Sequence, residues 1–155
     1  PGDLARSLGP CSETARLPMR HEPADYTDVS ATYSLEADGA VRVQNRAFDG
    51  KRELQESIGQ AKPAKPGDNT KLEVTFLPEG LRWIPFTKGD YWILRLDSDY
   101  RTALVGSPDY EYLWLLHREP TLDAATRDDY LDTARTLGYD LDRLILTPHT
   151  GQRTA

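Results

Sequence analysis

Residues suited to carrying out chemistry are few in this chain of 155 residues, and they are scattered along it. The three histidines, His21, His117 and His149, have a spacing that matches no metal-binding motif. The single cysteine, Cys11, excludes an intrachain disulfide and is predicted to be a small buried residue, with covalent capture of a tetrapyrrole or another electrophile as the alternative. No glycine-rich phosphate loop, Ser/His/Asp order or Cys-x-x-Cys pair is present. We therefore predict no catalytic residue, no metal and no cofactor.

The composition is that of an ordinary globular protein with an acidic balance. Charged residues make up 28% and hydrophobic residues 38% of the chain, which predicts a single domain, 1–155, with an entry arm at 1–10 and a tail at 148–155. The net charge of −6 argues against nucleic acid and against anionic lipid headgroups as partners, because both attract basic surfaces. No window approaches about 18 uncharged apolar residues, and no signal peptide or anchoring cysteine is recognised at Pro1. We expect no membrane span.

The elements that must position the functional residues are predicted to be short antiparallel strands. The expected strands are Glu13–Met19, Val29–Leu35, Val41–Arg46, Leu54–Ala61, Lys71–Phe76, Asp90–Leu96 and two more within Leu96–Pro120. Turn residues separate them, above all the Asp-Gly hairpin turn within 36–39. Eight strands at short, even spacing predict an up-and-down antiparallel barrel, because closure removes the exposed edges of the sheet.

Alternation along the strands indicates which side chains point inward. The inward faces of two strands carry Val41, Val43 and Asn45 in one, and Trp92, Leu94 and Leu96 in the other. An eight-stranded barrel has room for one small ligand, so these faces are candidate pocket walls.

One helix interrupts the strand pattern, at Asp123–Leu137. Thr121 or Asp123 can cap its first turn, and Gly138 supplies its end. Its apolar residues repeat at helical spacing, which predicts that it packs on the outside of the barrel. A short strand, Leu144–Leu146, follows it.

Several segments of the sequence carry a family resemblance. They read LARSLGP, ARLPMR, TDVSATYSLEADGAVRVQNR, KLEVTFLP, GDYWILRLDSDY, ALVGSPDYEYLWLLHREP and GYDLDRLI, within residues 3–147. In their order and spacing they resemble the bacterial lipocalins of the outer-membrane-lipoprotein type, which are similar to apolipoprotein D. The resemblance implies an all-β fold, an eight-stranded antiparallel lipocalin (calycin) barrel with one C-terminal α-helix packed outside.

Three short regions are characteristic of that family, and this chain departs from the first. Gly-x-Trp is replaced by Gly9-Pro10-Cys11, whereas Ser98-Asp99-Tyr100 and Arg118 match the second and third regions. The resemblance implies structural roles for Gly9, Asp99, Tyr100 and Arg118, with the arginine stacked on the tryptophan at the closed end of the barrel. Because a cysteine stands in that position, Arg118 loses its expected partner, and we expect a void that costs roughly 3–5 kcal/mol.

By resemblance, the function is to bind and transport a hydrophobic small molecule, natively a fatty acid or a lysophospholipid. The predicted walls of its pocket are Ala31, Tyr33, Val43, Asn45, Val74, Trp92, Leu94, Trp114 and Leu116, with His21 at the barrel mouth. In similar lipocalins the tyrosine and asparagine border the ligand, so Tyr33 and Asn45 are expected to orient a polar head or a carbonyl. The family implies a location in the bacterial cell envelope. Some of its members dimerise, so monomer and homodimer both stay open.

Two other functions are left open by the sequence. Departures from the family suggest a pocket engineered for a synthetic dye or fluorogen, with natural drift under a changed ligand as the competing account. These departures are at Cys11, Ser12, His21, Thr87 and His117. A small calycin enzyme would instead use Glu13, Tyr33 or His21. For Glu13 we favour pairing with a cation, such as Arg16 or Arg118, over a role as a lone catalytic acid.

Overall fold

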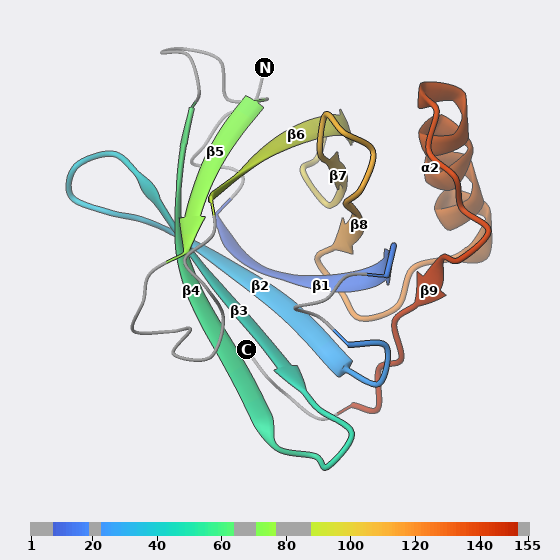
Figure 1. Cartoon of the computed structure of the whole chain (residues 1–155), viewed down its shortest axis with the longest axis horizontal. Coiled ribbons are helices and arrows are strands. Elements are labelled where there is room, and N and C mark those ends of the chain that lie inside the picture. The colour runs from blue at the N-terminus through green and yellow to red at the C-terminus, as the bar shows by residue number, and fades with distance from the viewer. Residues whose placement is uncertain (1–7, 19–22, 64–70, 77–87, 152–155) are drawn as a thin grey trace.

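The fold is a closed antiparallel barrel with one helix outside it (Figure 1). The computed structural model describes residues 8–18, 23–63, 71–76 and 88–151. The barrel strands are β1 (Gly9–Arg16), β2 (Thr27–Leu35), β3 (Val41–Phe48), β4 (Leu54–Pro63), β5 (Lys71–Phe76), β6 (Lys88–Leu96), β7 (Thr102–Gly106) and β8 (Leu113–His117). Each strand pairs with the next along the chain, and β1 also pairs with β8, which closes the sheet. The expected eight-stranded up-and-down barrel is confirmed.

The β2–β3 hairpin shows how the sequence builds this barrel locally. Gly39 in its turn has a φ of +87°, and Asp38 Oδ1 accepts a hydrogen bond of 3.0 Å from the backbone N–H of Ala40. The strand that follows buries Val41 and Val43, as its alternating pattern predicts.

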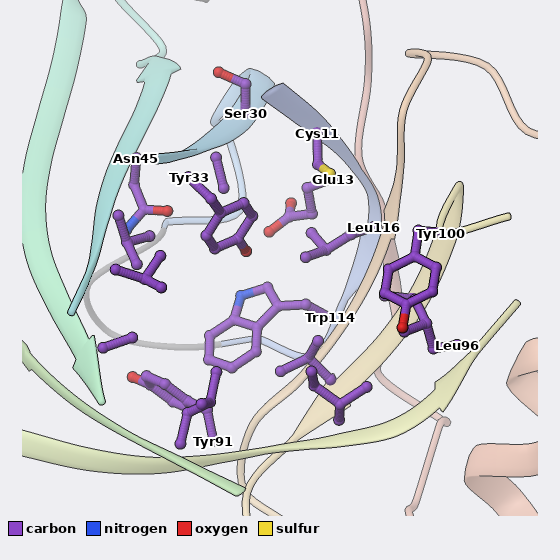
Figure 2. A pocket seen from close by; sticks show the side chains of 18 of the residues that line it. Cys11, Glu13, Ser30, Tyr33, Asn45, Tyr91, Leu96, Tyr100, Trp114 and Leu116 are labelled. Carbon is purple, nitrogen blue, oxygen red and sulfur yellow. The ribbon is translucent and has the colours of Figure 1, made fainter. Parts of the chain in front are cut away.

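The first strand begins earlier than predicted and contains a bulge. It covers Gly9–Arg16 rather than Glu13–Met19, and its register against β8 shifts between Glu13 and Ala15. Cys11 and Glu13 therefore line the barrel interior (Figure 2), whereas Ala15 packs on the side of the helix. A regular strand would have placed Ala15 on the same face as Glu13; the bulge prevents this, because it adds one unpaired residue.

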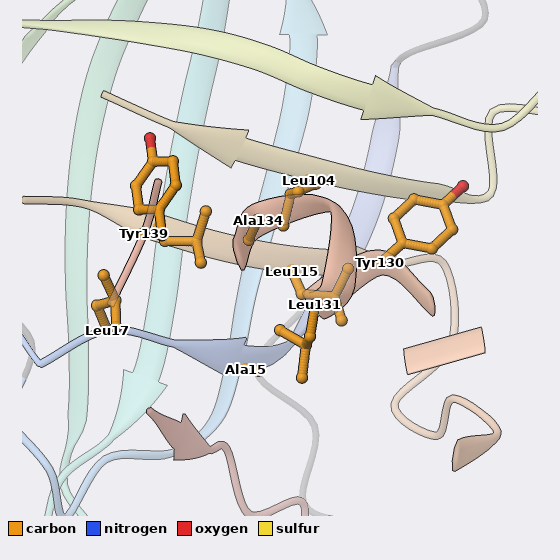
Figure 3. Packing of buried hydrophobic residues seen from close by; sticks show 9 residues of the cluster. Ala15, Leu17, Leu104, Leu115, Tyr130, Leu131, Ala134 and Tyr139 are labelled. Atoms are coloured by element: carbon orange, nitrogen blue, oxygen red, sulfur yellow. The ribbon is translucent and has the colours of Figure 1, made fainter. Parts of the chain in front are cut away.

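The helix α2 (Ala124–Leu137) packs against the outside of the barrel (Figure 3). Asp123 is its N-cap and accepts a hydrogen bond of 2.9 Å from the backbone N–H of Thr126, and Gly138 ends it with a φ of +113°. The contact is a cluster of buried residues, here called the helix-side core: Ala15, Leu17, Leu104, Leu113, Leu115, Tyr130, Leu131, Ala134 and Tyr139. Within the described part of the chain, no helix has the length and apolar character needed to cross a membrane.

A second bulge reverses part of the predicted pattern in β6. The register against β7 shifts between Ile93 and Arg95. Leu94 consequently packs against the helix-side core, and Arg95 Nη2 lies 2.7 Å from Asp129 Oδ2 of α2. The prediction that Leu94 shares a face with Leu96 is therefore wrong, since Leu96 lines the interior and Leu94 lies outside.

The segment after the helix ties the chain back to the barrel. The short strand β9 (Ile145–Leu146) pairs with β1, one residue shorter than predicted. Beyond it, the backbone N–H of Asp28 donates to the carbonyl of Pro148 at 2.9 Å, and that of Thr150 donates to Asp28 Oδ1 at 2.8 Å. The first part of the expected tail at 148–155 is thus hydrogen-bonded to Asp28 of β2, as far as residue 150.

Candidate ligand-binding site

The barrel encloses a cavity of about 200 Å³, and every one of its eight strands contributes to the wall (Figure 2). Predicted wall residues that lie on this cavity are Ala31, Tyr33, Val43, Asn45, Val74, Trp114 and Leu116. Most of the wall is aliphatic or aromatic. A largely apolar cavity of this kind can bind a molecule by removing its carbon surface from water.

Two predicted wall residues lie elsewhere, and one prediction falls outside the described residues. Leu94 belongs to the contact with the helix, and Trp92 is not part of the lining. The ring of Trp92 is instead covered by the ammonium group of Lys71, 4.8 Å from the ring centroid. Both residues belong to β6, in which Tyr91 and Ile93 line the cavity instead. His21, predicted at the barrel mouth, lies outside the described residues.

Sequence reasoning missed several wall residues for identifiable reasons. The segment Asp90–Leu96 is apolar on both faces, so alternation alone did not decide between Tyr91 and Trp92. Leu72 lines the cavity two residues before Val74, and the same alternation that predicted Val74 would have found it.

An aromatic cluster forms one part of the wall. The indole ring of Trp114 meets Tyr91 edge to face, with ring centroids 5.0 Å apart and planes at 85°. Tyr112 stacks on the same indole at 5.8 Å and 10°. Burial raises the pKa of Tyr91 to about 12, so this phenol is neutral at physiological pH. The three rings pack on one another, and two of them, Tyr91 and Trp114, present an aromatic surface to the cavity.

Two neutral polar side chains reach into the cavity from β2 and β3. Burial raises the pKa of Tyr33, and its hydroxyl makes no hydrogen bond to any residue that the structure describes. Asn45 Nδ2 donates a long hydrogen bond of 3.4 Å to Ser57 Oγ, and its amide oxygen points into the cavity (Figure 2). Both groups are therefore placed to bond a polar atom of a ligand or a water.

A buried ion pair stands beside these groups. Glu13 Oε2 lies 3.0 Å from Arg16 Nη1 and accepts a hydrogen bond of 2.6 Å from Thr147 Oγ1. Arg16 Nη2 also donates to the carbonyl of Pro23 at 2.7 Å. The pairing of Glu13 with Arg16 that the sequence favoured is thus present, and Glu13 also lines the cavity.

Comparison with known proteins identifies this architecture. The model of the lipocalin-like domain matches residues 3–149. The chain belongs to the lipocalin-like family. Temperature-induced lipocalin-1 of Arabidopsis thaliana is 39% identical over 151 residues, which cover 96% of this chain and 80% of that protein. Outer membrane lipoprotein Blc of Escherichia coli is 35% identical over 150 residues, with the same two coverages, 96% and 80%.

More distant lipocalins share the fold. Apolipoprotein D of mouse is 24% identical over 151 residues, covering 94% of this chain and 76% of that protein. Among solved structures, insecticyanin of the tobacco hornworm has a TM-score of 0.72 at 18% identity, covering 97% of this chain and 82% of that one. Lipocalins bind hydrophobic small molecules, and they are generally binding and transport proteins.

One end of this lipocalin's cavity is built around Arg118. Its guanidinium donates to three backbone carbonyls, those of Tyr100 at 3.0 Å, Leu8 at 2.9 Å and Pro10 at 3.4 Å. Cys11, which stands where the family resemblance places tryptophan, lines the cavity beside it. Burial raises the pKa of the Cys11 thiol, although the positive charge of Arg118 opposes this, so the thiol is a weak nucleophile.

The turn between β6 and β7 positions Arg118 through Tyr100, whose φ is +57°. The carboxylate that fixes this turn belongs to Asp97, which accepts from the backbone N–H groups of Arg101 at 2.7 Å and Thr102 at 2.8 Å. Asp99, for which the family resemblance implies a structural role, lies in the same turn and is exposed. A single oxygen of Asp97, Oδ1, reaches both N–H groups across the turn. In the described ranges no cluster of side chains has a metal-binding arrangement.

Proposed function

We propose that this lipocalin binds one apolar molecule in its barrel cavity and carries it through water. The observation that supports this most strongly is the largely apolar cavity wall to which all eight strands contribute. Each Å² of ligand carbon removed from water contributes about 25 cal/mol before the cost of ordering the ligand. A largely apolar cavity of about 200 Å³ has room for one acyl chain, so a fatty acid or a lysophospholipid is the class of ligand we propose.

The location and the assembly of the protein are part of the same proposal. The relatives named outer membrane lipoprotein Blc, such as that of Escherichia coli, favour carriage of lipid within a bacterial envelope. We propose a monomer as the carrying unit, because the eight strands close the cavity within one chain. Sedimentation velocity with and without ligand tests this; a dimer that forms only with ligand would contradict it.

Native mass spectrometry of the protein purified from cells is the direct test. A mass increase that disappears on denaturation, with a lipid recovered in the extract, is the expected result. After removal of lipid, N-phenyl-1-naphthylamine, a neutral apolar probe, is expected to enter the cavity and to become brightly fluorescent.

Two tryptophans offer a matched pair of variants for this test. Trp114→Ala removes a large part of the cavity wall and is expected to lower probe affinity at least tenfold. Trp92→Ala removes an indole that lies outside the cavity and is expected to change the probe affinity less than twofold. Equal effects of the two substitutions, or no probe binding by the folded wild-type protein, would contradict binding in this cavity.

A planar aromatic ligand is a second candidate, and the rings around Trp114 favour it. Tyr91 and Tyr112 fix the indole in two directions, so a flexible chromophore against it would lose rotational freedom. The fluorescence of 9-(2,2-dicyanovinyl)julolidine, a molecular rotor dye, is expected to increase when this protein is added. The substitution Cys11→Trp is expected to reduce that increase by filling one end of the cavity. A dye that stays dark while lipid binds would eliminate this candidate.

Binding rather than turnover is the activity we propose. Glu13, on which a catalytic alternative depends, is engaged in the ion pair with Arg16, and the raised pKa of Tyr33 keeps its phenol protonated. The phenol of Tyr33 is therefore not an available general base near neutral pH, and Arg16 and Thr147 engage one oxygen of Glu13, Oε2. Recovery of the bound ligand chemically unchanged after prolonged incubation tests this; a product whose formation stops in Glu13→Gln would overturn it.

A further inference from the structure

Glu13 is the one acidic side chain among the described residues that line the cavity, and its burial is almost complete. The residue is 2% exposed and lies on an otherwise largely apolar wall, between Cys11 and Leu116 (Figure 2). The cost of burying a carboxylate is high unless each oxygen has a partner. The hydrogen-bond partners of its two oxygens therefore determine which polar ligand groups can bind beside it in the cavity.

The two oxygens of this carboxylate have different surroundings. Oε2 takes both partners, Arg16 Nη1 at 3.0 Å and Thr147 Oγ1 at 2.6 Å. No residue that the structure describes donates to Oε1. The carboxylate points into the cavity in Figure 2, and neither Arg16 nor Thr147 is part of the lining. One acceptor oxygen is thus presented to the cavity, while its counter-charge stays behind the wall.

The charges around Glu13 do not offer an anion a place at this oxygen. Arg16 is fully buried and directed to Glu13 and to the carbonyl of Pro23. Behind the strand, His149 Nε2 donates to the Glu13 carbonyl at 2.6 Å, and its Nδ1 lies 4.0 Å from the Asp28 carboxylate. An anionic ligand group at Oε1 would therefore meet a like charge, and among the described residues the cation nearest to that charge, Arg16, is not part of the cavity lining.

The cations that do line the cavity are directed elsewhere. Arg118 is held by backbone carbonyls at the end of the cavity near Cys11, and Arg101 Nη2 pairs with Glu119 at 3.1 Å in an exposed contact. A carboxylate ligand bound through Arg118 is the competing arrangement, and it predicts the opposite selectivity.

We propose that Glu13 is a specificity determinant that selects apolar ligands carrying a hydrogen-bond donor, such as an alcohol, over ligands whose polar group is a carboxylate. This deepens the proposed function and rests on it. A hydroxyl placed against Oε1 forms a charge-assisted hydrogen bond inside the barrel, where competition from water is weak. Within the proposed acyl-chain class, the favoured molecules are then hydroxyl-bearing lipids rather than free fatty acids.

Competition against N-phenyl-1-naphthylamine with three ligands of equal chain length tests the proposal. The ligands are 1-decanol, its methyl ether and decanoate at pH 8, with the delipidated wild-type protein. We expect 1-decanol to bind about tenfold more tightly than the ether, which lacks the donor, and more tightly still than decanoate. This comparison needs no substitution, so it does not depend on the folding of a variant.

Glu13→Gln supplies the matching variant, with Thr147→Val as its control. Glu13→Gln removes the charge at nearly constant shape, so the preference for 1-decanol over decanoate is expected to fall to about twofold or less. Thr147→Val removes one bond to Oε2 but keeps the charge and Oε1, so the preference is expected to persist. Because Glu13→Gln leaves Arg16 without its carboxylate, the double substitution Glu13→Gln/Arg16→Met provides a folded alternative with both charges removed.

The outcomes separate this inference from the function on which it rests. If the probe does not bind to the folded wild-type protein, the proposed function itself fails. If the probe binds and 1-decanol, the ether and decanoate compete equally, carriage stands and the role of Glu13 is overturned. Tighter binding of decanoate than of 1-decanol would likewise overturn it and would assign the polar group of the ligand to Arg118.

Discussion

Arg16 and Glu13 form an ion pair of 3.0 Å in which the two side chains are 0% and 3% exposed. Breaking such a pair leaves an uncompensated charge in the interior, which costs about 3–5 kcal/mol. Arg16→Met is therefore expected to lower the free energy of unfolding by that amount, measured by urea denaturation. The double substitution Glu13→Gln/Arg16→Met should recover at least half of the loss. A single substitution as harmless as the double one would show that the pair is not buried as described.

The position of Cys11 predicts a gain of stability when it is filled. The cavity reaches this residue, and Arg118 lies beside it. Cys11→Trp adds apolar volume against the guanidinium and is expected to raise the free energy of unfolding by about 1–3 kcal/mol. The same change shortens the cavity, so long ligands should bind more weakly than short ones. Cys11→Ser serves as the control, and a destabilised Cys11→Trp would indicate that this end has no free space.

The contact between α2 and the barrel predicts a contrast between two leucines of one helix. Leu131 is 4% exposed within the helix-side core, whereas Leu137 is 43% exposed. Leu131→Ala is expected to lower the free energy of unfolding by about 2–5 kcal/mol. Leu137→Ala, made on the same helix, is expected to change it by no more than about 0.5 kcal/mol. Thermal unfolding of both variants measures the difference, and similar losses would contradict the packing of the helix.

The phenol of Tyr91 predicts loss of stability in alkali. Its pKa is raised to about 12 by burial, above the value near 10 of an exposed tyrosine. The unfolded chain therefore loses this proton at a lower pH than the folded chain. The free energy of unfolding should be unaffected by this group below about pH 10 and should fall as the pH rises from about 10 to 12. Urea midpoints across this range measure the effect.

Substitutions at tyrosine positions assign that alkaline loss. Tyr91→Phe should make the decline shallower, because the titrating group is removed. Tyr110→Phe, at a residue 54% exposed, is the control and should leave the decline unchanged. A decline that is identical in all three proteins would show that other groups account for it.

Local sequence patterns were sufficient for the architecture of this lipocalin. The turn at Gly39, the alternation of Val41 and Val43, and the Asp123 and Gly138 caps act within a few residues of the chain, and the structure has each of them. The barrel follows from such signals, because strands joined by short turns pair with their neighbours and leave two edges that close on each other.

Alternation failed where a strand contains a bulge. In β6 the shift between Ile93 and Arg95 moves Leu94 out of the cavity, and in β1 the shift after Glu13 moves Ala15 to the helix side. In β6 the sequence gives no sign of the shift, because apolar residues occur on both faces of the strand. One face meets the cavity, and part of the other face meets the helix.

The sequence by itself determined that this chain forms a closed eight-stranded barrel with an apolar interior and one helix outside. Only the tertiary structure decided which oxygen of Glu13 faces the cavity, since its partners include Thr147, which lies 134 positions away in the chain. It likewise decided that the guanidinium of Arg118 is held by carbonyls of the first strand and the segment before it. The physical reason is the same in both cases: periodicity reports the face of an element, whereas a buried polar group is oriented by partners that the folding of distant segments brings to it.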